Sequence, residues 1–397
     1  MRRLDRMKLQ KLCAALLAAA LTAGAAGCSA KPAARTVPEE FRLRGQCAAT
    51  PAGVYEVKNV GEIYNKIRLD QKRIYYIDWD SCRETLLCTR KDCTHDSEDC
   101  PAWVGAGALF GTEANGSLLI AQPMEDGSNA VWQVAPDGSE KTLAAQCPAA
   151  GEDGSLLVGK NEAGIWAVAT REGGAFSLMV WQQPGQWTEV FSADEVFQWP
   201  QMVRDNVFYY ETWDNEAGQT TLWRAALELS ARPEKVVEYE SDRTRILLRG
   251  DQVWMADART GNVSVKPLDG TGEPEPVCTL PEEAREHIIE PVDTDGSRMV
   301  LSWGGDFWAV DLATGEETII RPAGVNASGE DLSPEYYTGS AGGQWALTDG
   351  YLRSREGINY TGVSIERTTR YDAQLCRLDR QALLNGEIVL TEIRSDS

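Results

Sequence analysis

One unit recurs along this chain and constrains its fold more than any other feature. Each copy reads as a strand in which apolar and polar residues alternate, a tight turn rich in Asp, Gly or Pro, and a second alternating strand. Alternation with a period of two predicts antiparallel strands that bury one face, so we expect an all-β protein. Seven copies can be aligned, over residues 74–88, 131–145, 180–191, 222–239, 253–268, 307–320 and, in degenerate form, 375–390.

The spacing of these copies predicts how they are arranged. Consecutive anchor residues are 56, 49, 42, 31, 54 and 68 residues apart, with an average of 50. A four-stranded propeller blade takes roughly 40 to 50 residues, and closing blades into a ring leaves no bare edge. We therefore predict a β-propeller of seven blades, with a six-bladed ring or two β-sandwiches as alternatives. The anchors are Tyr76, Trp132, Trp181, Trp223, Trp254, Trp308 and Cys376.

The N-terminal residues predict export. Five basic residues precede an apolar run from Leu12 to about Gly27. This pattern is typical of a signal peptide, and the run is shorter than the roughly 20 residues of a membrane-spanning helix. The run ends in Ala25-Ala26-Gly27-Cys28. This stretch resembles the bacterial lipobox, in which the cysteine is diacylated and becomes the mature N-terminus. The alternative is ordinary cleavage after Ala23-Gly24-Ala25, which would leave Cys28 as an exported thiol.

These features divide the chain into three parts. We expect a lipoprotein signal peptide over residues 1–27, a polar, proline-bearing tether over 28–45, and one β-propeller domain over 46–397. Lipidation of Cys28 would anchor the protein in the cell membrane, on its extracytoplasmic face.

The charge balance limits the partners of the exported chain. The formal net charge is -21, and removal of residues 1–27 leaves 34 basic and 59 acidic side chains, a net charge of -25. A surface this acidic repels nucleic acid and favours cations or basic partners.

The known catalytic patterns are missing from the sequence. Its two histidines, His95 and His287, give little support to a Ser-His-Asp hydrolase, and it has neither a phosphate-binding loop nor a dinucleotide fingerprint. Two convergent carboxylates would suffice for a glycosidase, but 59 acidic residues offer no basis for choosing a pair.

A cysteine block, LCTRKDCTHDSEDCPAW over residues 87–103, is the most distinctive local feature. Cys88, Cys93, His95 and Cys100 offer the ligand types of a structural Cys3His zinc site, although the spacing lacks the Cys-x2-Cys pair of zinc fingers. A disulfide staple is the favoured interpretation, because an exported protein with an even number of cysteines can carry a disulfide framework. Free or catalytic thiols are the third alternative. The cysteines after residue 28 are Cys47, Cys82, Cys88, Cys93, Cys100, Cys147, Cys278 and Cys376.

The lipobox-like leader, the block from YYIDWDS to EDCPAW and the later repeats together resemble a group of propeller lipoproteins from Gram-positive anaerobes. The repeats are also similar to those of pyrroloquinoline-quinone-type and translocation-protein-type propellers, with ValAspLeuAlaThrGlyGlu (310–316) as the turn motif. The resemblance implies a location and a shape, and it implies no activity.

The combined expectation is a lipid-anchored extracytoplasmic lipoprotein whose propeller is a binding or scaffold module for a protein, peptide or glycan, without catalytic activity. Structural zinc in the cysteine block is the one cofactor that the sequence suggests. The alternative is an extracytoplasmic carbohydrate-active enzyme that uses carboxylates of the propeller channel, which predicts two or more Asp or Glu side chains converging with perturbed pKa values.

Overall fold

The structure is a computed structural model that describes residues 40–44, 47–50, 53–59, 72–104, 109–112, 118–124, 128–147, 156–161, 164–170, 174–182, 186–280, 282, 290–303, 306–320, 345–347, 350–353, 376–387 and 389–395. Its strands form six hydrogen-bonded sheets, in which the pairing is antiparallel with one short parallel exception. The prediction of an all-β fold is confirmed. Within the described ranges, α3 (Arg380–Leu384) is a single short helix, and no helix there is long and apolar enough to cross a membrane.

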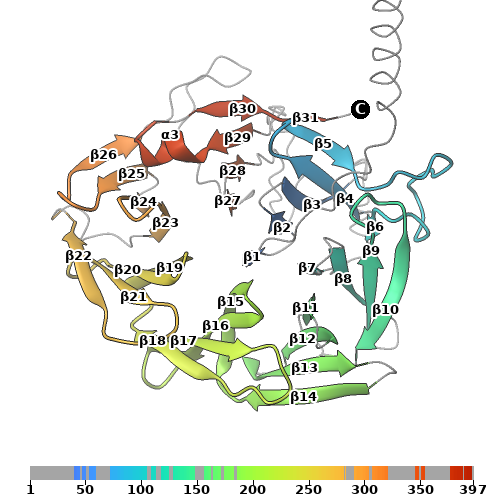
Figure 1. Cartoon of the computed structure of the whole chain (residues 1–397), viewed down its shortest axis with the longest axis horizontal. Helices are drawn as coiled ribbons and strands as arrows, with labels where there is room; N and C mark the ends of the chain where they lie inside the picture. Colours follow the sequence, from blue (N-terminus) through green and yellow to red (C-terminus); the bar gives the residue numbers. More distant parts are fainter. Residues whose placement is uncertain are drawn as a thin grey trace, which may run out of the picture. The chain divides into compact units, whose positions relative to one another are not determined.

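The strands succeed one another in groups of four, each strand paired antiparallel with the next (Figure 1). We call such a group a meander, and the described residues form seven. The first three are β2 (Cys47–Thr50), β3 (Gly53–Asn59), β4 (Lys72–Asp78) and β5 (Arg83–Leu86); β7 (Leu109–Thr112), β8 (Leu118–Pro123), β9 (Asn129–Val134) and β10 (Lys141–Cys147); and β11 (Leu156–Asn161), β12 (Gly164–Thr170), β13 (Phe176–Gln182) and β14 (Gln186–Ala193).

The remaining four meanders continue in the same order along the chain. They are β15 (Val196–Arg204), β16 (Val207–Asp214), β17 (Gln219–Ala226) and β18 (Glu234–Tyr239); β19 (Thr244–Arg249), β20 (Gln252–Asp257), β21 (Asn262–Pro267) and β22 (Glu275–Thr279); β23 (Glu290–Thr294), β24 (Arg298–Trp303), β25 (Asp306–Asp311) and β26 (Glu317–Ile320); and β27 (Trp345–Leu347), β28 (Gly350–Arg353), β29 (Cys376–Asp379) and β30 (Leu390–Glu392).

Three further strands connect or extend these meanders. β1 (Glu40–Arg44) pairs with both β2 and β15, and so joins the first and fourth meanders into one sheet of eleven strands. Residues 40–44, which we expected to belong to the tether, are therefore part of a sheet. β6 (Trp103–Val104) pairs with β4, and β31 (Arg394–Ser395) pairs in parallel with β5.

Successive meanders pack against one another through their apolar faces. Leu119 of the second meander and Val158 of the third lie in one buried cluster, and Trp254 of the fifth meander shares another cluster with Leu301 of the sixth. Successive side chains of a strand point to opposite faces of the sheet, so the apolar ones gather on one face. A neighbouring sheet must cover that face to remove it from water. The core is therefore divided into layers between meanders.

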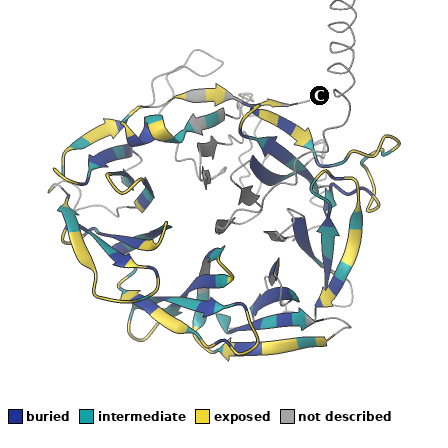
Figure 2. Ribbon diagram, viewed as in Figure 1, coloured by how far each residue is buried: buried dark blue, intermediate teal, exposed yellow. Residues whose placement is uncertain are grey.

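Burial changes systematically across each meander (Figure 2). The second strands β12, β16 and β20 are almost wholly buried along their middle residues. The fourth strands β10, β14 and β18 alternate between buried and exposed residues or are mainly exposed. The fourth strand of a meander is thus the one that faces solvent.

The repeated turns have a common construction, illustrated by the turn between β25 and β26. The Asp311 carboxylate accepts hydrogen bonds from the backbone N–H groups of Ala313 and Thr314, at 2.9 and 3.0 Å. Gly315 donates its own N–H to the Asp311 carbonyl at 2.8 Å and has φ of +73°. Glycine occupies this left-handed conformation without steric cost. The turn motif that we identified in the sequence is therefore a self-contained hydrogen-bonded corner.

Candidate metal centre

The cysteine block leaves and rejoins the first meander at the same edge. β5 pairs with β4 up to Leu86, opposite Tyr75. After the excursion the chain returns as β6, whose Trp103 lies opposite Arg73 on that strand. The N–H of Ile74, between these two pairs, donates to the Ala102 carbonyl at 2.8 Å. Both ends of the loop are therefore fixed on β4, which limits how far its side chains can separate.

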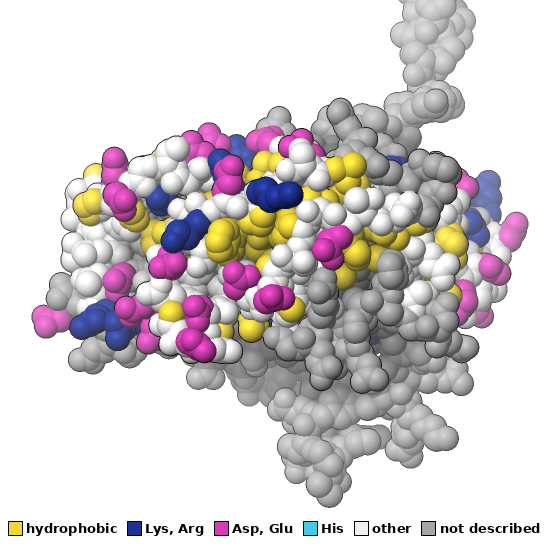
Figure 3. All heavy atoms as spheres, turned by 90° about the horizontal axis from the view of Figure 1, so that it is seen from below, with side chains coloured by type: hydrophobic (Ala, Val, Ile, Leu, Met, Phe, Trp, Pro, Cys, Tyr) yellow, Lys and Arg dark blue, Asp and Glu magenta, His cyan; other side chains and the backbone are white. Residues whose placement is uncertain are grey.

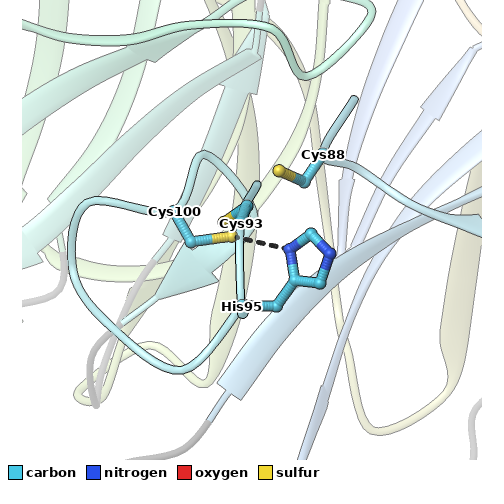
Figure 4. Close-up of side chains that lie close together, drawn as sticks. All are labelled: Cys88, Cys93, His95 and Cys100. Carbon is cyan, nitrogen blue, oxygen red and sulfur yellow. Dashed lines mark hydrogen bonds between the residues drawn. The ribbon is translucent and has the colours of Figure 1, made fainter. Parts of the chain in front are cut away.

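The four predicted ligand residues lie together within this loop (Figure 4). One ligand atom from each of Cys88, Cys93, His95 and Cys100 can be chosen so that all four lie within 4.8 Å of one another. The Cys100 Sγ and His95 Nδ1 are 3.5 Å apart. Cys100 is fully buried and the other three are partly exposed. The cluster is thus enclosed on one side and open to solvent on the other.

Local backbone turns direct these side chains inward. Cys93 donates its N–H to the Arg90 carbonyl at 3.4 Å, and Cys100 donates to the Ser97 carbonyl at 3.0 Å. His95 has φ of +61°, a left-handed conformation that few residues other than glycine adopt. Strained backbone of this kind persists where the surrounding structure requires it. Here it reverses the chain between Cys93 and Cys100, so that the histidine ring faces the thiols.

The thiols influence one another electrostatically. Burial raises the pKa of Cys88, and burial likewise raises the pKa of Cys100 to about 12. For Cys93, burial acts in the same direction, but the N–H of His95 and the two neighbouring thiols outweigh it and hold the pKa below its usual value. A bound cation would favour the deprotonated form of all three, because metal ions bind thiolates and release their protons.

The donor set and the spacing fit a tetrahedral metal ion such as zinc. Zn–S bonds of about 2.3 Å and Zn–N bonds of about 2.0 Å place neighbouring ligand atoms about 3.5 to 3.8 Å apart. The distance between Cys100 Sγ and His95 Nδ1 already lies at this value, and the other atoms need move by no more than about an ångström. The structure therefore contains a Cys3His group that could bind a metal.

A disulfide would use this arrangement only in part. It would join two of the three sulfurs and leave the third thiol and His95 without a role. All cysteines whose side chains are described carry free thiols: Cys82, Cys88, Cys93, Cys100, Cys147 and Cys278. Cys82 instead directs its thiol to the Trp79 carbonyl at 3.4 Å.

Other predicted residues fall elsewhere or outside the described ranges. Cys47 begins β2 and Cys376 begins β29, whereas Cys28, with the whole expected leader, and His287 lie outside the described residues. The expected lipidation therefore stays a prediction.

Two basic residues at the cluster were not predicted from the sequence. Arg90 lies within the loop and donates to the Asp99 carbonyl at 2.8 Å, next to Cys100. Lys141 begins β10 in the second meander and donates to the Trp103 carbonyl at 3.0 Å. The position of Arg90 between two cysteines was a visible signal in the sequence, but no sequence pattern predicts that Lys141 contacts Trp103, 38 residues earlier.

Comparisons with known proteins support the fold class and identify no family. No family model and no curated protein matches the chain. A puromycin hydrolase mutant complexed with PGG aligns with a TM-score of 0.50 and 14% identity, over 88% of this chain and 54% of that one. This chain thus spans about half the length of the hydrolase. A nidogen/laminin complex aligns with a TM-score of 0.32 and 11% identity, over 62% of this chain and 89% of that one. The expected kinship with propeller lipoproteins stays a prediction.

Proposed function

We propose that the seven meanders are the blades of one β-propeller. Consecutive meanders share buried cores, and the C-terminal strand β31 pairs with β5 of the first meander. The Arg394 N–H also donates to the Cys82 carbonyl at 2.9 Å. Contact between the two ends of a repeat array is what ring closure requires. The hydrolase with which the chain aligns is itself a propeller-containing protein.

The Cys3His group is proposed to hold one structural zinc ion. The ligands would be the Sγ atoms of Cys88, Cys93 and Cys100 and the Nδ1 atom of His95. Four protein ligands leave no open coordination position, which distinguishes structural from catalytic zinc. Zinc would clamp a loop that lacks regular secondary structure over residues 87–102.

Metal analysis tests this assignment directly. Protein purified without oxygen should contain one zinc per chain, and Cys100→Ser should lose it, because removal of a ligand weakens a structural site strongly. Cys278→Ser is the matched control, since Cys278 lies in β22, outside the cluster, and it should retain full zinc. A metal-free protein with a disulfide between two of the three loop cysteines would overturn the proposal.

We further propose that the propeller is an exported, lipid-anchored binding scaffold. Export and anchoring rest on the leader sequence and Cys28, whereas the observation that supports a scaffold over an enzyme is the pairing of the buried carboxylates. Each of the four in the described part of the chain contacts a basic or phenolic partner: Glu56 and Glu84 with Lys58, Glu211 with Tyr239, and Asp293 with Arg249 and Arg380. A glycosidase needs a carboxylic acid and a carboxylate directed at a substrate. Carboxylates engaged in this way favour the scaffold over the enzyme.

The surface charge favours a cationic or basic partner. Acidic side chains are scattered over the face drawn in Figure 3, around a band of hydrophobic ones. The chain expected after removal of the leader carries a net charge of -25, which favours a basic peptide or protein segment over an anionic polymer.

Two measurements test the scaffold proposal. The full chain should incorporate an alkyne-labelled palmitate analogue and sediment with membranes, whereas Cys28→Ala should do neither. An array of basic peptides and neutral glycans should show saturable binding without product formation. Turnover of any glycan that is abolished by Glu56→Gln or Glu211→Gln would replace the scaffold with the enzyme.

A further inference from the structure

The loop that carries the Cys3His group also contacts the neighbouring sheet. The Thr89 N–H donates to the Gly138 carbonyl at 3.3 Å, and Arg90 Nε donates to the Ser139 carbonyl at 3.1 Å. Both acceptors lie in the turn between β9 and β10 of the second meander. Arg90 also donates to the Asp99 carbonyl, so one guanidinium group connects the residue beside Cys100 to the second meander.

The β9–β10 turn lies so close to the cysteine loop that the position of Gly138 has no room for a side chain. A Cβ atom on Gly138 would lie 2.4 Å from the carbonyl carbon and oxygen of Leu87 and 2.7 Å from the Cys88 nitrogen. Gly138 also has φ of +67°. The second meander is therefore in backbone contact with the first metal-ligand residue.

Lys141 brings a positive charge to the other end of the loop. Its ammonium donates to the Trp103 carbonyl and lies 5.0 Å from the centre of the Trp132 ring. Trp103 in turn donates its N–H to the Cys100 carbonyl at 3.0 Å. Burial lowers the pKa of Lys141, and the nearby acidic groups Glu98 and Asp99 act in the opposite direction. A cation held by a carbonyl and an aromatic face is positioned beside the cluster instead of moving freely in solvent.

The net charge of a metal-occupied site explains why a basic side chain beside it is favourable. Three thiolates and one neutral imidazole around a divalent ion leave one negative charge in excess. Partial burial makes this excess costly unless a positive group lies nearby. Groups outside the ligand shell that hold or neutralise the ligands commonly change metal affinity by about 10- to 100-fold.

We propose that Lys141 and Arg90 are outer residues of the metal site, and that metal binding thereby locks the β9–β10 turn of the second meander onto the first. This inference rests on the proposed zinc site. Lys141 is a positioning residue that belongs to a different sheet from the four ligands, so occupancy of the site stabilises the contact between two meanders as well as the loop.

Zinc affinity of the full chain tests the role of the charge. Competition with a chromophoric chelator should show about 10-fold or weaker binding in Lys141→Met, and Lys141→Arg should restore most of the loss because it returns the charge. Lys235→Met is the matched control, since Lys235 is an exposed lysine of β18 paired with Glu238, and it should leave the affinity unchanged. Arg90→Gln offers a second variant, with the same direction of change, should Lys141→Met fail to fold.

Hydrogen exchange tests whether metal binding stabilises the contact between the β9–β10 turn and the first meander. Removal of zinc from the wild type should increase exchange in residues 128–147 together with residues 87–104, and leave residues 207–226 unaffected. Exchange that rises only in residues 87–104, or equal zinc affinity in wild type and Lys141→Met, would refute this inference while leaving the zinc site intact. Absence of bound zinc in the wild type would refute both.

Discussion

Replacement of Asp293 by Asn should weaken the contact between three meanders at once. Asp293 lies in β23 and is 2% exposed. Its carboxylate accepts hydrogen bonds from Arg380 at 2.5 and 3.2 Å, and it lies 3.4 Å from Arg249 Nε. Arg249 ends β19 in the fifth meander, and Arg380 begins α3, directly after β29 of the seventh. Asn preserves the shape of the side chain but removes the buried negative charge that faces Arg249 and Arg380.

The expected loss can be estimated from these contacts. Breaking a buried ion pair costs about 3 to 5 kcal/mol. The lower end applies here, because the two arginine side chains are 17% and 18% exposed and retain some contact with water. For a chain of this size, the free energy of unfolding falls by about 3 kcal/mol per molar urea. A loss of about 3 kcal/mol therefore lowers the urea midpoint of unfolding by about 1 M. Tryptophan fluorescence during equilibrium urea unfolding measures this shift.

A matched variant separates burial from charge. Asp251 lies 2.7 Å from Arg204, but its side chain is 90% exposed. Exposed ion pairs contribute about 0 to 1 kcal/mol, so Asp251→Asn should shift the midpoint by less than about 0.3 M. Equal shifts in the two variants would refute the argument that Asp293 connects three meanders through a buried charge. Combining Asp293→Asn with Arg249→Met should cost less than the sum of the single changes, because residues in contact are not independent.

Three further changes test the packing and the turns. Phe176 is fully buried, with its ring centre 5.1 Å from that of Tyr210, so Phe176→Ala should cost about 3 to 5 kcal/mol in urea unfolding; a loss below 1 kcal/mol would contradict the layered core. Ile393 is 3% exposed beside β31, whereas Val389 is 47% exposed; Ile393→Ala should lower the thermal midpoint clearly and Val389→Ala should not. Backbone and hydroxyl donors of the turn hold the pKa of Asp311 below its ordinary value. Its contribution to stability is therefore complete above about pH 4 and is lost as pH falls through the folded-state pKa, so Asp311→Asn should flatten the acid limb of a stability–pH curve, and an unchanged limb would count against the turn.

The sequence analysis identified the repeats correctly, but it placed the anchor of one repeat on a different strand of its meander from the other six. Six anchors lie on the third strand of a meander, and Trp254 lies on the second. Its cross-strand partner on the third strand is Val265. Cross-strand partners in a sheet point to the same face, so either position can fill the same layer between meanders. With Val265 as the anchor, the irregular intervals of 31 and 54 residues become 42 and 43.

Other features depended on contacts that no local pattern contains. Residues 40–44 read as part of a polar tether, but they form β1 through backbone hydrogen bonds, which do not depend on side-chain hydrophobicity. Cys88, Cys93, His95 and Cys100 could be singled out from the sequence because they lie within thirteen residues, whereas their convergence depends on both ends of the loop being fixed on β4. Lys141 could not be predicted, because its place beside the loop follows from how the second meander packs on the first.

The cysteine block directly follows β5, the strand of the first meander that pairs with β31. Lengthening a closed loop adds only about 0.6 kcal/mol of entropy cost per doubling, so the distance in sequence between β5 and β31 is a modest obstacle to their pairing. The contact itself is small, since it consists of two residue pairs, Arg394 with Arg83 and Ser395 with Glu84. A short strand with so few partners needs support from its other side. β5 continues directly into Leu87, which is buried against the second meander, and then into Cys88. A metal clamp at that point would fix β5, the strand of the first meander that pairs with β31, which is a physical reason for placing the ligands directly after it.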